Sequence, residues 1–341
     1  MTRASRRRWW ILAPVLVLVL LPIVGGGWLF YELDQRPMAV SDPPATLEVP
    51  RGSSLHALGR ELEARGWISG ATRFGLRIYG RLTGISAELK AGEYAVEQGM
   101  TVRQLLARVR AGRVKLHPLT VVEGWTFARL REALGRHDAV EQTLEGIPDH
   151  EIMEELGLGE RHPEGMFFPT TYHFPRGTTD RDLLRVAFGQ MRQELARVWA
   201  ERRPELPLED PYEVLTLASI IERETGRDDE RRKVAGVFTR RLEQGMRLQT
   251  DPTVIYGLGE DYDGRLRRSD LRRDTPYNTY TRHGLPPTPI ALPGRASLKA
   301  AVDPKPGSAL YFVSRGDGSH HFSDTLDEHN EAVRRYILEE E

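Results

Sequence analysis

The chain has 341 residues, of which 40% are hydrophobic and 28% charged. This length allows one large domain or two smaller ones with a substantial core, and the composition excludes collagen-like, low-complexity and largely disordered chains. The formal net charge of −1 argues against nucleic acid as the main partner. The absence of cysteine excludes disulfide scaffolds, zinc–cysteine sites, iron–sulfur clusters and thiol nucleophiles.

The N-terminus has the pattern of a membrane anchor. Residues 1–8 carry four arginines and no acidic residue, and residues 9–31 carry no charge. As a helix, that uncharged run extends about 34 Å, more than the roughly 30 Å of a bilayer core. The arginines predict that residues 1–8 stay in the cytoplasm and that the rest is exported. A cleaved signal peptide is the alternative, although its apolar core is usually shorter, about 7–15 residues.

The exported part is expected to begin with a linker and a small module. Its net charge is −1 − 4 = −5, which predicts little attraction to nucleic acid or anionic lipid. Residues 32–45 contain three prolines among polar residues, as linkers do. The residues that follow predict a small α+β module over 46–113, with strands at 46–49 and 93–96 and helices at about 54–65, 71–82 and 102–110.

Residues 114–341 predict a larger mixed α/β domain. A strand is expected within 114–122, followed by helices at about 127–134, 137–145, 149–157, 180–203, 212–225 and 228–244. Residues 246–296 are rich in Gly, Pro, Thr, Asn and Tyr and lack periodicity. Their aromatic and amide groups suit a sugar chain, but an ordered surface loop is the open alternative. The C-terminus predicts a helix at 296–302, strands at 310–313 and 321–322, and a final helix with a capping box at Thr325.

The predicted helix 212–225 delivers two carboxylates at its end. It is apolar on nearly every face and is therefore expected to be buried. Arg227, three residues after Glu224, is expected to keep Glu224 ionised, whereas Glu222 has no cation three or four residues away. Burial should then raise the pKa of Glu222, as general-acid catalysis near neutral pH requires. The alternative is that Glu222 is the first exposed residue of a fraying helix end.

Three further segments carry candidate polar residues. Glu164 precedes residues 166–172, which predict either an edge strand or the wall of a cleft. Asp251, before a proline, is expected to cap a helix or to contact substrate. His320 and His321 predict no metal site, because neighbours on a strand face opposite ways and no metal-binding spacing accompanies them.

Several motifs occur in a characteristic order: Leu217-Ala218-Ser219-Ile220-Ile221-Glu222, then 247–257, Tyr277-Asn278-Thr279-Tyr280, Gly284-Leu285-Pro286-Pro287 and 297–301. With Glu164-Gly165 and Phe168-Pro169-Thr170-Thr171-Tyr172 upstream, the chain resembles the YceG-like (MltG) family of endolytic peptidoglycan transglycosylases. The resemblance extends over essentially the whole chain, and residues 46–113 resemble the family's LysM-like subdomain.

The resemblance implies a site and a set of partners. The family's catalytic glutamate falls on Glu222. Weaker substrate-binding assignments follow for Glu164, Thr250, Asp251, Tyr277 and Asn278. No cofactor and no metal are implied. The implied partners are peptidoglycan glycan strands, the inner membrane and peptidoglycan synthases, with no nucleic acid.

The implied reaction needs one carboxyl group. Neutral Glu222 would protonate the oxygen of the bond between N-acetylmuramic acid and N-acetylglucosamine, and the carboxylate would then take the proton of the attacking muramoyl C6 hydroxyl. The product is a 1,6-anhydro end, formed by an inner-membrane protein with a periplasmic catalytic domain that ends glycan elongation. The alternatives are a non-catalytic glycan-binding or division scaffold, and an envelope protease or esterase with a serine or metal site.

Overall fold

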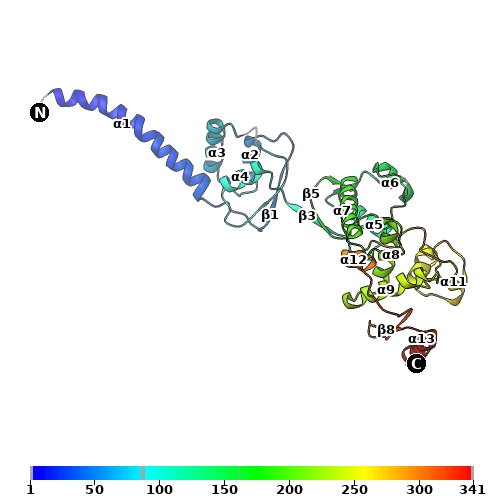
Figure 1. Cartoon of the computed structure of the whole chain (residues 1–341). Coiled ribbons are helices and arrows are strands. Elements are labelled where there is room, and N and C mark those ends of the chain that lie inside the picture. Colours follow the sequence, from blue (N-terminus) through cyan, green and yellow to red (C-terminus); the bar gives the residue numbers. More distant parts are fainter. Residues whose placement is uncertain (1–2, 86–88, 160, 339–341) are drawn as a thin grey trace. The chain divides into compact units, whose positions relative to one another are not determined.

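The computed structural model describes residues 3–85, 89–159 and 161–338. The chain forms two compact units, of which the first comprises Met1–His117 with Phe174–Arg176 and the second Pro118–His173 with Gly177–Glu341 (Figure 1). Both contain helices and strands, so the mixed architecture expected from the sequence is confirmed. The boundary falls at residue 117 or 118, where the sequence places it at 113 or 114.

The first unit begins with α1 (Arg3–Phe30), which continues as a π-helix over Tyr31–Gln35. Within the described residues, one helical stretch, Leu16–Gln35, is long and apolar enough to cross a membrane. This stretch overlaps the run at 9–31 that the sequence singles out.

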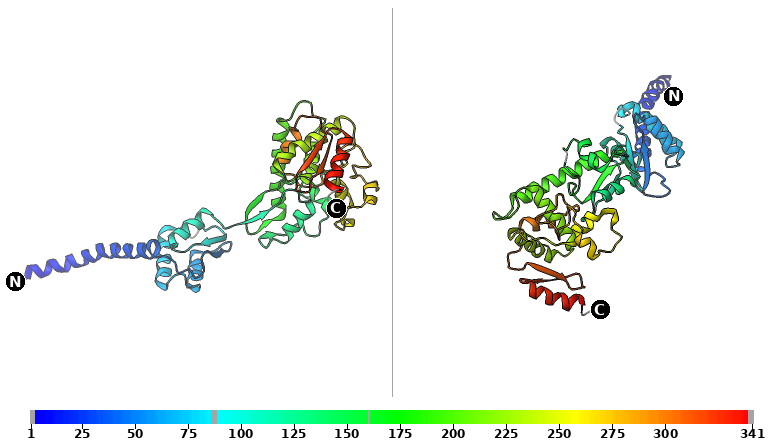
Figure 2. Two further views of the ribbon diagram at one scale, coloured as in Figure 1. Left: turned by 90° about the horizontal axis from the view of Figure 1, so that it is seen from below. Right: turned by 90° about the vertical axis from the view of Figure 1, so that its right-hand side faces the viewer.

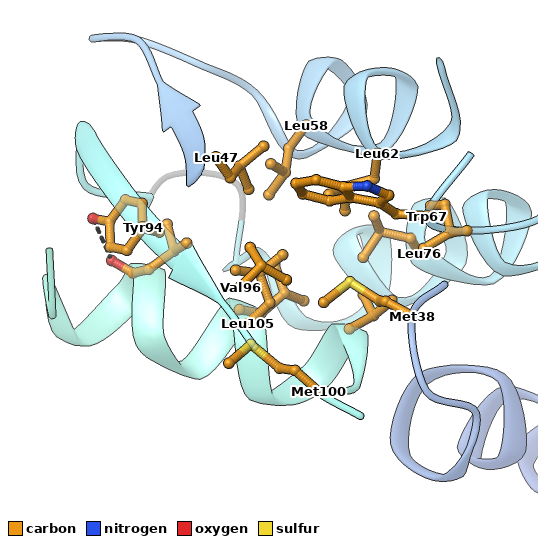
Figure 3. Close-up of a cluster of buried hydrophobic side chains, with 14 of the residues drawn as sticks. Met38, Leu47, Leu58, Leu62, Trp67, Leu76, Tyr94, Val96, Met100 and Leu105 are labelled. Atoms are coloured by element: carbon orange, nitrogen blue, oxygen red, sulfur yellow. Dashed lines mark hydrogen bonds between the residues drawn. The ribbon is translucent and has the colours of Figure 1, made fainter. Parts of the chain in front are cut away.

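The small module has the element order expected from the sequence. It comprises β1 (Ala45–Val49), α2 (Leu55–Ala64), α3 (Gly70–Thr83), β2 (Gly92–Val96) and α4 (Val102–Ala111). The two strands pair antiparallel, from Ala45 opposite Val96 to Val49 opposite Gly92. The helices enclose a core that includes Leu47, Leu62 and Tyr94 (Figure 3).

Residues 32–40, the larger part of the linker expected at 32–45, pack into this module instead. Leu33 and Met38 are buried in its core. Glu32 is also buried, where it accepts hydrogen bonds from Thr72 at 2.5 Å and from Arg36 at 3.0 Å. The π-helix thus connects α1 to the module through packed residues.

The second unit begins with short strands around small helices. Its first elements are β3 (Leu116–Thr120), α5 (Phe127–Gly135), β4 (Val140–Glu141), a 3₁₀ turn (Asp149–Glu151), α6 (Ile152–Glu155), β5 (Thr171–Pro175), β6 (Thr178–Thr179) and α7 (Asp180–Ala200). The first two residues of β3 and the last two of β5 belong to the first unit. Strand β3 pairs with β5, and β4 pairs in parallel with β6. The segment 166–172 is therefore a strand only from Thr171, and Phe167 before it is fully buried.

The helix predicted at 137–145 is wrong. The chain there forms β4 and a loop, because the buried Asp180 carboxylate accepts the backbone N–H groups of Thr143 and Leu144, both at 3.0 Å. These backbone N–H groups, which a helix would pair with carbonyls four residues back, are therefore bonded to a side chain almost forty residues away.

The centre of the second unit is a helical cluster. Helix α8 (Pro211–Glu224) packs against α7, α9 (Asp228–Glu243), α10 (Asp251–Leu258) and α12 (Arg295–Val302). A 3₁₀ turn (Gly259–Asp261) and α11 (Arg268–Arg272) interrupt the loops between α10 and α12. The C-terminal hairpin of β7 (Tyr311–Ser314) and β8 (His320–Ser323) packs on α13 (Leu326–Val333), which ends in a π-helix at Arg334–Leu338 (Figure 2).

Candidate active site

Helix α8 positions both candidate carboxylates. Every residue from Val214 to Ile221 is buried, as the sequence predicts. Two residues along a helix correspond to a rotation of about 200°, so Glu222 and Glu224 point to opposite sides of α8. The two carboxylates therefore have different neighbours.

Glu224 has the raised pKa that the sequence predicts for Glu222. Burial, the largest cause, and the nearby Asp251 raise the pKa of Glu224, while a hydrogen bond from Thr250 and the charges of His320 and Arg241 lower it, and the result is a pKa of about 7. The Thr250 hydroxyl donates to Glu224 Oε1. The expected pairing of Glu224 with Arg227 is wrong, because the next helix begins immediately and directs that guanidinium to Asp229, 3.2 Å away.

A cavity of about 430 Å³ opens beside Glu224. Residues from six segments distant in sequence line it, among them Gln249, Asp251, Tyr280, Tyr311 and Asn330. Gln249 has a φ of 51°, in the left-handed region that residues other than glycine rarely adopt. Such backbone outliers gather at functional sites, where the surrounding structure holds them in place.

Glu222 has an ion-pair partner that its own helix does not reveal. Its side chain is 6% exposed, and Arg231 Nη2 of α9 lies 3.7 Å from its Oε1. Its Oε2 accepts the backbone N–H of Gly294 at 2.8 Å. Burial, and after it the charge of the Glu222 carboxylate, raises the pKa of the neighbouring Glu123. Glu222 indeed has no cation three or four residues away, but this does not leave it without a cation, because Arg231 comes from another helix.

Glu164 forms a third polar cluster. Its carboxylate accepts the backbone N–H of Phe127 at 3.0 Å and the Tyr256 hydroxyl at 3.1 Å. Burial raises the pKa of Glu164 to about 7 against these hydrogen bonds. The Tyr256 ring stacks edge-on against Tyr277 at 4.9 Å, and the Tyr277 hydroxyl lies 2.9 Å from that of Thr288. Glu164 and Tyr277 thus belong together, but neither lines the cavity beside Glu224.

The remaining predicted residues divide between cavity and scaffold. Asp251 lines the cavity and accepts a hydrogen bond from the Tyr280 hydroxyl at 2.6 Å. It is the first residue of α10, and Thr250 holds the capping position expected for it. Asn278 is fully buried and donates to the carbonyls of Asp270, Leu271 and Arg273, so its amide organises the loop.

Sequence reasoning missed several residues of these clusters. Arg241 on α9 and Asn330 on α13 reach the cavity from distant segments, and no local spacing links them to Glu224. Glu123 was missed for the same reason, because its side chain packs on Gly294, which is distant in sequence. A Cβ built on that glycine would lie 1.8 Å from Glu123 Oε1. Within the described part of the chain, no group of three or more His, Asp or Glu side chains could hold a metal ion.

Comparison with known proteins gives consistent matches. The sequence profile of the YceG-like family matches residues 47–335. A Bacillus subtilis protein named endolytic murein transglycosylase is 31% identical over 334 residues, which cover 92% of this chain and 91% of that protein. A Streptococcus pneumoniae protein of the same name is 26% identical, over 94% of this chain and 64% of its own length.

A solved structure also matches. A crystal structure of a YceG-like protein from Listeria monocytogenes has a TM-score of 0.50 and 30% sequence identity. The match covers 84% of this chain and 98% of the Listeria chain. The sequence and structural matches therefore point to the same family.

Proposed function

Because the chain belongs to the YceG-like family, we propose that it is an endolytic murein transglycosylase, a lyase that cuts the glycan strands of peptidoglycan internally. The relative that supports this most directly carries that name and aligns over nine-tenths of both chains. The bond cut is the β-1,4 linkage between N-acetylmuramic acid and N-acetylglucosamine, and the product carries a 1,6-anhydro-muramoyl end.

The reaction needs one carboxyl group acting twice. Protonation of the glycosidic oxygen lets the leaving sugar depart, and the resulting carboxylate accepts the proton of the muramoyl C6 hydroxyl as that oxygen attacks C1. Hydrolytic glycosidases use a second carboxylate as the nucleophile or to activate water, a role that the attacking hydroxyl replaces here. An attacking group within the substrate also removes the entropic cost of positioning a water molecule.

Within this function we assign the proton donor to Glu224 in place of Glu222. The observation that carries the assignment is the enclosed Glu224 carboxyl, with a pKa of about 7, at the wall of a cavity. A general acid works best when its pKa is near the working pH. Glu222, by contrast, lies beside the guanidinium of Arg231 and already accepts a backbone N–H.

Neighbours of Glu224 support both proton transfers. Thr250 donates to Oε1, so Oε2, which accepts no hydrogen bond from the described residues, is the oxygen that carries the proton. After the first transfer, the Thr250 hydrogen bond and the Arg241 charge stabilise the carboxylate. The Tyr280 hydroxyl donates to Asp251 in the wall of the same cavity, where both side chains can contact sugar hydroxyls. Glu164, Tyr277 and Asn278 keep the loops of this wall in place.

The N-terminal helix supplies the location. We assign α1 as a retained single-pass anchor in the inner membrane, with the arginine-rich N-terminus in the cytoplasm and both units in the periplasm. The small module is assigned as LysM-like. An enzyme tethered there meets new glycan strands as peptidoglycan synthases release them, and a cut at that point ends their elongation.

The test is product analysis. The purified full-length chain in detergent should cut uncross-linked glycan strands internally, and mass spectrometry should find anhydro-muramoyl ends. Reducing ends would identify a hydrolase and contradict the proposal. Binding of strands without any cleavage would favour the non-catalytic scaffold instead.

A further inference from the structure

The outer face of α3 exposes large apolar side chains. Phe74 is 57% exposed and Leu82 is 75% exposed, although both are large hydrophobic residues. Positions 74, 78 and 82 are four residues apart, so they form one stripe along the helix. The opposite face of α3 packs into the module core through Leu76.

Cationic side chains border this stripe. Arg77 and Arg81, again four residues apart, are exposed, and neither forms an ion pair with any residue that the structure describes. Arg73 differs, because Glu63 pairs with it at 2.7 Å. An apolar stripe flanked by unpaired arginines is typical of helices that lie on an anionic lipid surface.

The packing of α3 against α1 fixes how deep the apolar face of α3 lies relative to the membrane. The Trp28 and Phe74 rings lie 6.3 Å apart. Leu29 packs so closely on α3 that a Cβ built on Gly75 would lie 3.2 Å from its side chain. Tryptophan prefers the membrane–water interface, and Trp28 lies three residues before the end of the uncharged run. Phe74 is therefore held at the level of the lipid headgroups when α1 is inserted.

We propose that α3 docks on the anionic surface of the bilayer that α1 spans, with Phe74 and Leu82 among the headgroups and Arg77 and Arg81 on lipid phosphates. The inference rests on the proposed anchorage and is independent of the transglycosylase activity. Because residues 32–38 pack into the module core, docking fixes the orientation of the whole module on the membrane. The acidic net charge of the exported part does not oppose it, since screening confines surface electrostatics to about 10 Å.

The test uses site-specific fluorescence. The chain has no cysteine, so Leu82→Cys accepts a single environment-sensitive NBD label, and Glu48→Cys on β1 provides a matched exposed control. The full-length labelled proteins are reconstituted in vesicles of phosphatidylglycerol and in vesicles of phosphatidylcholine. The expected result is a blue-shifted emission at position 82 in phosphatidylglycerol only, with water-like emission at position 48 in both.

Charge reversal supplies the second measurement. Arg77→Glu with Arg81→Glu, in the Leu82→Cys background, should lower the ratio of docked to undocked protein by at least about 30-fold, the effect of losing the two positive charges alone. Circular dichroism checks that the fold is retained, and strand cleavage in detergent should be unchanged.

Each of the remaining outcomes contradicts the proposal, and each points to a different cause. Water-like emission at position 82 in both vesicles, or a shift that ignores lipid charge, excludes docking on anionic lipid. A shift that grows with the ratio of protein to lipid assigns the face to a second copy of the chain. If alkaline extraction releases the protein from vesicles, the anchorage itself fails, whereas the transglycosylase assignment stands or falls by its products.

Discussion

Replacement of Glu224 by glutamine is expected to stabilise the fold at alkaline pH. The pKa of this carboxyl rises from 4.5 to about 7, a difference of 7 − 4.5 = 2.5 pH units. At about 1.36 kcal/mol per unit, keeping the carboxylate ionised above pH 7 costs the native state roughly 3 kcal/mol. The cause is burial, which a neutral amide of the same shape does not oppose.

The sign of the pH dependence follows from proton binding. The native-state pKa is the higher one, so between pH 4.5 and 7 the native protein binds more protons than the unfolded chain. Tighter proton binding by Glu224 stabilises the native state. This contribution is fully present below pH 4.5 and is lost as the pH rises through 7. Glu224→Gln should therefore gain stability relative to the wild type between pH 5 and pH 8.

Urea denaturation of the wild type, Glu224→Gln and Glu222→Gln at pH 5 and pH 8 measures this effect. The free energy of unfolding of Glu224→Gln, relative to that of the wild type, should rise by roughly 2–3 kcal/mol from pH 5 to pH 8. Glu222→Gln is the matched control and should lose stability at pH 8, because its carboxylate accepts the Gly294 N–H and faces Arg231. A difference for Glu224→Gln that does not grow with pH would refute the reasoning.

Three further predictions follow from the same contacts. Thr250→Val removes a hydrogen bond that lowers the pKa of Glu224, so the alkaline limb of the pH–rate profile should move up by about one unit; a downward move would contradict the assignment. Asn278→Ala should lower the free energy of unfolding by roughly 2–4 kcal/mol in denaturant titrations, since three carbonyls lose their donor; a neutral effect would show that the loop does not depend on it. Gly294→Ala should lower the melting temperature because the new Cβ meets Glu123, and Glu123→Ala in the same chain should restore it; failure of the rescue would place the strain elsewhere.

Local signals predicted most helices and their starts. Ser54, Thr101, Thr126 and Thr325 each accept the hydrogen bond from the first turn that capping chemistry requires. Those signals act within four residues, so sequence alone contains them. The loop at 137–145 could not be predicted in this way, because the carboxylate that holds it belongs to Asp180.

The candidate site was predicted only in part for the same reason. Sequence located the carboxylates correctly at the end of a buried helix. The family resemblance, and not local spacing, added Thr250 and Asp251, which lie beside Glu224. The sequence prediction compared Glu222 with Glu224 by their neighbours on one helix, yet Arg231 comes from α9 and Thr250 from the loop before α10. Tertiary contacts therefore decide which of the two carboxyls faces a guanidinium at ion-pair distance, and those contacts have no signature in local spacing.

The most direct test of the central claim compares the two glutamates in cleavage. Single-turnover rates on uncross-linked glycan strands are measured for Glu224→Gln and Glu222→Gln, with strand binding measured alongside. Glu224→Gln should lose at least about 10²–10⁴-fold in rate while still binding strands, and Glu222→Gln should stay within about tenfold of the wild type. If Glu224→Gln is active while Glu222→Gln is folded but inactive, the assignment is contradicted and Glu222 is the proton donor.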